Sequence, residues 1–246
     1  MSVGLLDSLR CCDMGLNHVN IEPTNKCQSN FFCYGDDKNR KIGFMTLEKY
    51  RKILGMIPYP TEIRLFMSGE PFLHPRIIRM IDLACMEGHT VMIHSNGFAL
   101  KREHVFDLIE MGFKYPGRIL LNFIMQGASI PKNVDMLVKY QKNLHISFER
   151  IVPYPQRKEV PEFMKMYEGK VRFYIRWPKN RDDKVKEPFR ENLPGPCDMP
   201  EDSAAIYWNG DYPVCIRDFN KRSPTGNIFK GGWDVLVESK ENLKGG

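Results

Sequence analysis

The chain has 246 residues, a formal net charge of +6 and 42% hydrophobic residues, which is the composition of an ordinary soluble globular protein. This length suits one α/β domain with a small appendage. The sequence contains neither an apolar run of about 18 residues nor a secretory signal, so we expect a cytoplasmic protein without a membrane partner. The Lys and Arg residues are dispersed along the chain, which does not indicate a nucleic-acid partner.

The seven cysteines are an odd number and lie far apart in the sequence. This pattern argues against a disulfide framework and favours metal-binding, redox or buried thiols. Cys85 falls on the apolar face of an expected helix, so we expect it in the core. Cys27 and Cys33 differ from it because they bracket a polar and aromatic loop directly after a short apolar segment.

Apolar runs alternate with helical patterns along residues 19–177, and this alternation predicts parallel βαβ units. Gly112 is expected to stop the helix that precedes it. Six strand–helix units predict an α/β fold built as a partial, open (β/α)6 parallel barrel. The expected strands are 19–23, 62–67, 90–94, 118–125, 145–152 and 171–177, and the expected helices are 46–56, 75–87, 101–111, 132–142 and 159–167.

Residues 179–196 are charged, rich in proline and without periodicity, so we interpret them as a linker. They would join the barrel, residues 1–178, to a C-terminal module, residues 197–246. In this module we expect a hairpin of 203–208 and 212–216 around Asn209-Gly210, a pair suited to a type I′ turn. A short helix is expected near 233–240.

Three informative loops follow the first three expected strands. Binding sites of open α/β folds and barrels collect at these carboxyl ends. The loops hold Cys27 and Cys33, then Ser68-Gly69-Glu70-Pro71, then Ser95-Asn96-Gly97. In the second loop glycine permits a close backbone approach, proline fixes the turn, and Glu70 supplies a negative charge.

In this order, the three loops resemble the motifs of the radical S-adenosylmethionine (SAM) superfamily. There, Cys-x3-Cys-x2-Cys binds three irons of a [4Fe–4S] cluster, and SAM chelates the fourth iron. A Gly-Gly-Glu-Pro motif holds the SAM ammonium group, and Thr-Asn-Gly often follows the third strand. This chain departs from the pattern, because its cysteine loop is one residue short and lacks the middle cysteine. One Cys between Asn30 and Phe31 would restore the motif.

The resemblance implies roles for individual residues. Cys27 and Cys33 would ligate iron, and Glu70 would hold the amino group of SAM. On the last barrel strand Arg172, Tyr174 and Arg176 share one face, which lies either in the barrel interior or in solvent. The remaining residues that the resemblance places around SAM are Phe32, Tyr34, Ser68, Gly69, Pro71, Asn96, Asn122 and Gln126.

The C-terminal stretch resembles the start of a SPASM domain, an extension that carries auxiliary clusters in many members of the superfamily. The resemblance rests on Cys197, residues 206–211, Cys215 and residues 226–228. Two cysteines cannot complete an auxiliary cluster, which needs about four ligands. We therefore favour a small module without a cluster that covers the barrel mouth.

Two functions follow from these features. The first is a radical SAM enzyme, in which the cluster cleaves SAM and the 5′-deoxyadenosyl radical takes hydrogen from a substrate. That substrate would be a peptide, a sugar or a nucleotide, and an electron donor would be a partner. The second is a relative that lost the cluster and binds SAM, a nucleotide or a partner protein. The presence of iron distinguishes the two.

Overall fold

The computed structural model describes residues 18–29, 40–58, 61–125, 129–151, 162–176, 203–213 and 224–241. Its first six strands are β1 (His18–Ile21), β2 (Glu62–Arg64), β3 (Thr90–Ser95), β4 (Ile119–Ile124), β5 (His145–Ile151) and β6 (Arg172–Arg176). The helices between them are α2 (Leu47–Leu54), η1 (Pro71–Leu73, a 3-10 turn), α3 (Ile77–Met86), α4 (Arg102–Lys114), α5 (Lys132–Tyr140) and α6 (Glu162–Lys165). The elements expected from hydrophobic periodicity are therefore present, with shifted ends.

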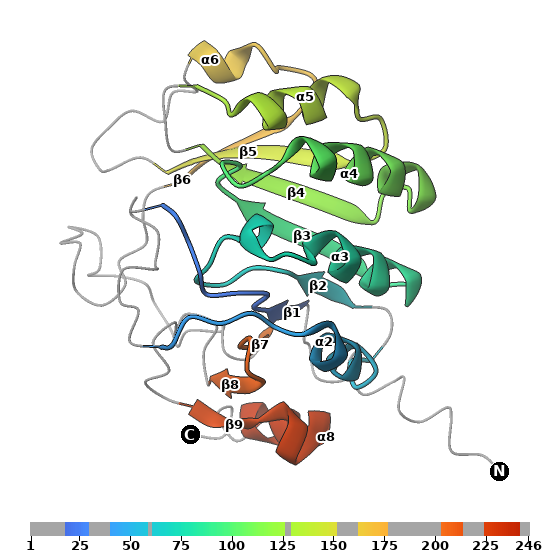
Figure 1. Ribbon diagram of the computed structural model, residues 1–246, viewed down its shortest axis with the longest axis vertical. Helices are drawn as coiled ribbons and strands as arrows, with labels where there is room; N and C mark the ends of the chain where they lie inside the picture. Colours follow the sequence, from blue (N-terminus) through green and yellow to red (C-terminus); the bar gives the residue numbers. More distant parts are fainter. Residues whose placement is uncertain are drawn as a thin grey trace.

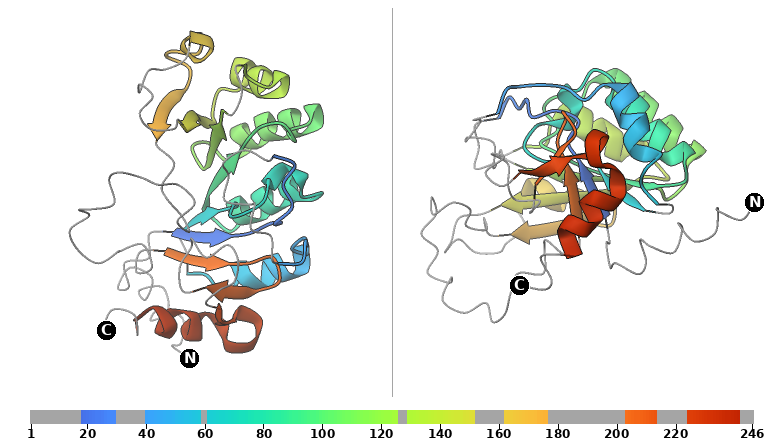
Figure 2. Two further views of the ribbon diagram at one scale, coloured as in Figure 1. Left: turned by 90° about the vertical axis from the view of Figure 1, so that its left-hand side faces the viewer. Right: turned by 90° about the horizontal axis from the view of Figure 1, so that it is seen from below.

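The strands form one parallel sheet in the order β6-β5-β4-β3-β2-β1, extended beyond β1 by a seventh strand, β7 (Ser203–Ile206). Its edge strands, β6 and β7, do not pair with each other, so the sheet is open and the expected α/β partial barrel is confirmed. The helices α2, α3, α4 and α5 lie along one face of the sheet (Figures 1 and 2). The opposite, concave face carries no helix among the described elements.

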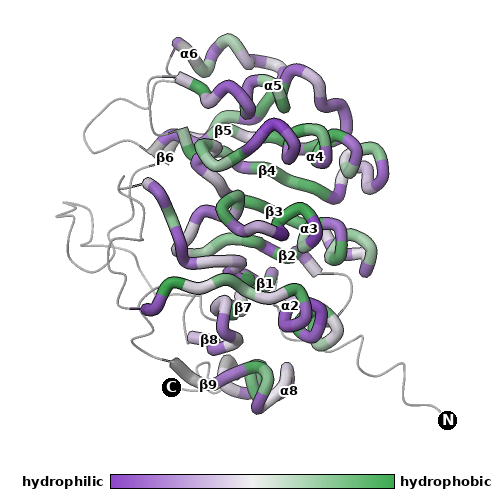
Figure 3. Tube along the Cα trace, viewed as in Figure 1, coloured by the Kyte–Doolittle hydropathy of each residue, from purple (hydrophilic) through white to green (hydrophobic). Residues whose placement is uncertain are grey.

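The core lies between the sheet and these helices. Residues alternate along each strand, so Val91 and Ile93 of β3 are buried beneath the helices, whereas Met92 and His94 point to the concave side. Strand β4 is hydrophobic along most of its length (Figure 3). Cys85 is 3% exposed in this core, as expected, and burial raises the pKa of its thiol to about 12.

Two helix ends test the sequence signals. Thr46 caps α2, because its hydroxyl accepts a hydrogen bond from the Lys49 N–H at 3.2 Å. The prediction that Gly112 stops α4 is wrong, since the helix continues to Lys114. A Cβ atom at Gly112 would lie 3.0 Å from Leu144 Cδ2. Glycine therefore permits close packing against Leu144, just before β5, and does not end the helix.

The predicted hairpin of residues 203–208 and 212–216 is also wrong. β7 pairs in parallel with β1, with His18 opposite Ser203 and Ile21 opposite Ile206. All four β7 residues are buried, so this short strand gains more burial inside the sheet than in an isolated hairpin. Its expected partner region forms β8 (Asp211–Pro213), which pairs antiparallel with β9 (Pro224–Asn227).

The expected turn at Asn209-Gly210 is present, with Gly210 at a φ of 94° and its N–H bonded to the Tyr207 carbonyl at 2.8 Å. The last helix, α8 (Ile228–Glu241), is longer than expected and kinked at Gly232. The predicted linker, residues 179–196, lies outside the described residues. No helix within the described ranges has the length and hydropathy needed to cross a bilayer.

A buried ion pair joins the end of β1 to segments far away in the sequence. Glu22 is fully buried, and its carboxylate accepts two hydrogen bonds from the Arg40 guanidinium, at 2.8 and 2.6 Å. The Ser68 hydroxyl and the Trp208 N–H donate to the same carboxylate at 2.6 and 3.3 Å. The Arg40 guanidinium also lies 4.1 Å from the centre of the Tyr207 ring. One carboxylate thus links the ends of β1, β2 and β7.

We predict that Arg40→Met lowers the free energy of unfolding by about 3–5 kcal/mol, because it leaves the Glu22 carboxylate buried without its cation. The double variant Glu22→Gln/Arg40→Met should be more stable than Arg40→Met alone, since no buried charge remains. Urea denaturation of the three proteins measures both effects. A double variant no more stable than Arg40→Met would contradict this reading of the pair.

A second prediction concerns acid stability. Burial and, to a lesser extent, the Arg64 guanidinium lower the pKa of His18 to about 4, and Arg64 Nη1 lies 3.0 Å from His18 Nε2. In the unfolded chain the pKa is about 6.5, so unfolding takes up a proton below that pH. His18 therefore contributes stability that is complete above about pH 6.5 and decreases as the pH falls toward 4.

The variant His18→Gln should consequently lose less stability than the wild type between pH 7 and pH 4.5, as measured by the urea midpoint at each pH. Parallel decreases in the two proteins would show that other groups dominate the acid sensitivity.

Candidate functional site

The three loops at the carboxyl ends of β1, β2 and β3 are hydrogen-bonded to one another. The Glu70 N–H, in the loop after β2, donates to the Lys26 carbonyl in the loop after β1, at 2.8 Å. The Gln28 amide donates to Asn96 Oδ1, in the loop after β3, at 3.1 Å. Cys27 lies between the two residues that make these contacts. We call residues 24–29, 68–71 and 95–98 together the joined loops.

The Glu70 side chain makes the third connection of the joined loops. Its Oε1 accepts hydrogen bonds from the Phe72 N–H at 3.1 Å and the Ser95 hydroxyl at 2.7 Å, and its Oε2 accepts one from the Asn96 N–H at 2.9 Å. The side chain is almost completely buried. Burial raises the pKa of the carboxyl group, and these three hydrogen bonds oppose that rise. Glu70 thus holds the backbone of two loops in place.

The other residues of the Ser68-Gly69-Glu70-Pro71 motif shape the loop. A Cβ atom at Gly69 would lie 2.1 Å from the Thr24 carbonyl oxygen, so only glycine permits this contact between the first two loops. Ser68 is buried and donates to Glu22. Pro71 is buried at the start of η1. The backbone of Thr24 and Asn25, in the loop after β1, thus packs directly against Gly69.

The base of the cysteine loop is closed by the segment that follows it. The Thr24 hydroxyl donates to the Gly43 carbonyl at 2.7 Å, and the Asn25 side chain bonds the Lys41 carbonyl at 3.1 Å and the Gly43 N–H at 2.9 Å. The backbones of Thr24 and Phe44 form an antiparallel bridge. The loop that carries both predicted thiol ligands therefore begins and ends at two segments that are bonded to each other, residues 24–25 and residues 41–44.

Cys27 is half-buried, and its sulfur accepts a hydrogen bond from the Ser29 N–H at 3.4 Å. Hydrogen bonds of this kind tune thiolates that bind iron–sulfur clusters. Within the described ranges, no three His, Cys, Asp or Glu side chains come together as a metal site. The predicted residues Cys33, Phe32, Tyr34 and Gln126 lie outside those ranges.

The two predicted asparagines have different surroundings. Asn96 belongs to the joined loops, where its Oδ1 also accepts a hydrogen bond from the Phe98 N–H at 3.0 Å. Asn122 lies on the concave face of β4. Its amide donates to Glu149 at 2.6 Å and accepts from the Ser147 hydroxyl at 2.8 Å. The structure therefore places Asn122 in a polar cluster with β5.

Sequence reasoning missed the pair of Glu22 and Arg40 beside the joined loops. An acidic residue directly after a buried apolar strand was the available signal for Glu22, because such an acid requires a partner. Nothing in the sequence identified Arg40 as that partner.

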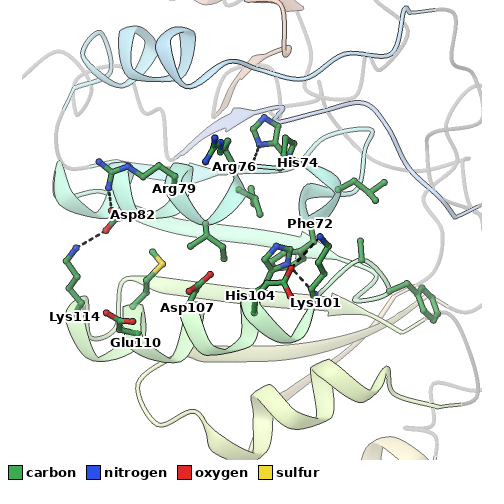
Figure 4. Close-up of a pocket in the computed structure, with 18 residues that line it drawn as sticks. Phe72, His74, Arg76, Arg79, Asp82, Lys101, His104, Asp107, Glu110 and Lys114 are labelled. Atoms are coloured by element: carbon green, nitrogen blue, oxygen red, sulfur yellow. Dashed lines mark hydrogen bonds and ion pairs between the residues drawn. The ribbon is translucent and has the colours of Figure 1, made fainter.

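Two cavities are prominent. One, of about 850 Å³, lies on the helical side between α3 and α4 (Figure 4). It is lined by ion pairs of Asp82 with Arg79 and Lys114 and by the stacked rings of Phe72 and His104, and it contains none of the predicted site residues. The other, of about 820 Å³, lies on the concave face and includes Asn122.

Comparisons with known proteins agree with this geometry. The family model of the radical SAM superfamily matches residues 21–123, a range that includes β2, β3, the joined loops and most of β4. No curated protein matches the sequence as a relative.

Several solved structures share the fold at low sequence identity. BtrN in complex with AdoMet and 2-DOIA is 14% identical, with a TM-score of 0.63 over 94% of this chain and 86% of that chain. Native anSMEcpe with bound AdoMet is 12% identical, with a TM-score of 0.65 over 92% and 82% of the two chains. Streptococcus suis SuiB bound to precursor peptide SuiA is 15% identical, with a TM-score of 0.62 over 98% and 69%. Residues 21–123 therefore match a radical SAM domain, and the chain shares its fold with these solved structures.

Proposed function

We propose that the chain binds SAM at the joined loops and that Cys27 and Cys33 hold an iron–sulfur cluster beside it. The observation that carries this proposal is the Glu70 carboxylate, which fixes the loops after β2 and β3 while the Glu70 N–H bonds the loop of Cys27. The match to the radical SAM family model and the AdoMet complexes of two similar folds support it.

Each residue has a role in this proposal. The negative charge of Glu70 favours the SAM ammonium group electrostatically, and its hydrogen bonds orient the loop backbone that meets SAM. Ser68, Gly69 and Pro71 fix the shape of that loop, and Asn96 supplies a side-chain amide. The aromatic rings of Phe32 and Tyr34 would flank the adenine, and Asn122 and Gln126 would face the ribose.

The fit of the cysteine loop to a [4Fe–4S] cluster is partial. Cys27 has the exposure and the N–H···S hydrogen bond expected of a ligand. The loop contains two thiols, however, where the motif of the superfamily has three. When bound, such a cluster supplies the electron that cleaves SAM to the 5′-deoxyadenosyl radical, which takes hydrogen from a substrate.

The shortage of thiols favours a second candidate, a cluster-free protein that binds SAM, a nucleotide or a partner at the same loops. Under the first candidate, an electron donor is a partner and the substrate is a small molecule or a peptide. The peptide is suggested by SuiB, whose solved complex contains a precursor peptide. We also propose that residues 197–246 form a SPASM-like module after the linker and that the protein is cytoplasmic.

Anaerobic reconstitution separates the two candidates. The first predicts about four irons and four sulfides per chain, and 5′-deoxyadenosine when SAM and dithionite are added. Cys27→Ala should lose both the iron and the product. Cys85→Ala is the matched control, because Cys85 is buried in α3 and burial raises the pKa of its thiol to about 12. It should retain both.

A wild-type chain that remains free of iron, with the fold intact by circular dichroism, would rule out the first candidate and leave the second. Equal iron loss in Cys27→Ala and Cys85→Ala would instead contradict the assignment of Cys27 as a ligand.

A further inference from the structure

Three large aromatic side chains are exposed on the outer surface of α4 and α5. Phe106 is 55% exposed, Phe113 is 60% exposed and Tyr140 is 58% exposed. An aromatic side chain has a surface of about 150–250 Å², so the three together expose roughly 350 Å². Single exposed apolar residues are ordinary, whereas an apolar group of this size is characteristic of an interaction surface.

The three rings belong to one surface. Phe106 and Phe113 are two helical turns apart, so both lie on the same side of α4. Helix α5 lies beside α4 and runs in the same direction, because each follows a strand of one parallel sheet (Figures 1 and 2). The Asn133 amide donates to the Leu100 carbonyl at 2.7 Å, which aligns the starts of the two helices. Tyr140, two turns after Asn133, therefore lies beside the middle of α4.

Apolar side chains continue this surface between the rings. Helical spacing places Ile109 between the two phenylalanines and Met136 one turn before Tyr140. Both are partly buried and pack against the core. We call Phe106, Ile109, Phe113, Met136 and Tyr140 the α4–α5 surface. Among the helices and strands that the structure describes, none covers it (Figure 2).

The charges along α4 determine what fits this surface. Arg102, Phe106 and Glu110 follow one another at intervals of four residues, so they form a row on the exposed side of the helix. The Arg102 guanidinium lies 5.5 Å from the centre of the Phe106 ring. Neither Arg102 nor Glu110 forms an ion pair with a residue that the structure describes. A row of cation, ring and anion is complementary to itself when reversed, because reversal exchanges the two charges.

Other partners fit this row less well. A purely acidic or purely basic partner would leave one of its two charges facing a like charge or no charge. An anionic lipid surface would be repelled by the exposed acids of α4, which are Glu103, Asp107 and Glu110. Only a partner that carries the same row in the opposite direction matches both charges and the ring.

We propose that two copies of the chain associate through the α4–α5 surface about a two-fold axis, with their α4 helices antiparallel and in contact at Phe106. This arrangement brings Arg102 of each copy to Glu110 of the other and shields the aromatic rings of both from water. Aromatic rings and arginines are the residues enriched in protein interfaces. The inference goes beyond the proposed function and does not depend on it, because α4 lies on the helical face of the sheet.

Sedimentation equilibrium of the full chain at several concentrations tests the proposal. We expect a monomer–dimer equilibrium with a micromolar dissociation constant. Arg102→Glu should weaken the dimer at least about tenfold, because it places a second acid beside Glu110. Glu110→Arg should weaken it likewise. The double variant Arg102→Glu/Glu110→Arg should restore the wild-type dissociation constant, since both pairs are then reversed. Arg51→Glu, the same change at an exposed position of α2, is the matched control and should leave the dimer unchanged.

A further variant tests the apolar part of the contact. Phe106→Ser should also weaken the dimer about tenfold or more, because the ring lies at the centre of the interface. Circular dichroism confirms that each variant is folded, and the four substituted positions are exposed. A wild-type chain that stays monomeric would overturn the proposal. A dimer that survives Phe106→Ser and both charge reversals, or one that the double variant fails to restore, would overturn it as well.

Discussion

The hydrogen bonds of the Glu70 carboxylate are the interaction on which the candidate site depends. A buried carboxylate is stable only when its oxygens are occupied, and here the donors are Phe72, Ser95 and Asn96. The acid therefore couples the loop after β2 to the loop after β3, and its backbone N–H adds the loop after β1 through Lys26. Three short motifs that are separate in the sequence are thereby joined by hydrogen bonds.

A second buried acid serves the same end of the sheet. Glu22 is neutralised by Arg40 and accepts hydrogen bonds from the Ser68 hydroxyl and the Trp208 N–H. It therefore links Arg40, which follows the cysteine loop, to the residue that follows strand β7. Consecutive strand ends thus carry one fully satisfied carboxylate each. The low dielectric constant that makes these acids costly when unpaired also makes their correct pairing specific. The cysteine loop is held at its base by this arrangement.

Local patterns predicted much of this fold. The βα alternation predicted the parallel, open sheet and the helices of the barrel, and the turn residues marked the three loops. Non-local contacts were out of reach: β7 pairs with β1, and Asn20 bonds the carbonyl of Ala204, 184 residues away. Gly112 was misread because glycine serves close packing as well as helix ends. The resemblance to the superfamily placed Asn122 near SAM but did not identify Glu149 as its partner.

The most direct test of the account is the affinity of the chain for SAM, compared between wild type and Glu70→Gln by equilibrium dialysis. In the variant the amide NH₂ must face the Asn96 N–H in one orientation, or the Phe72 N–H and the Ser95 hydroxyl in the other, so a backbone donor always loses its acceptor. We predict micromolar to millimolar binding by the wild type and a loss of about tenfold or more in the variant, with the fold retained. Equal affinities in the two folded proteins would contradict the claim that SAM binds at the joined loops.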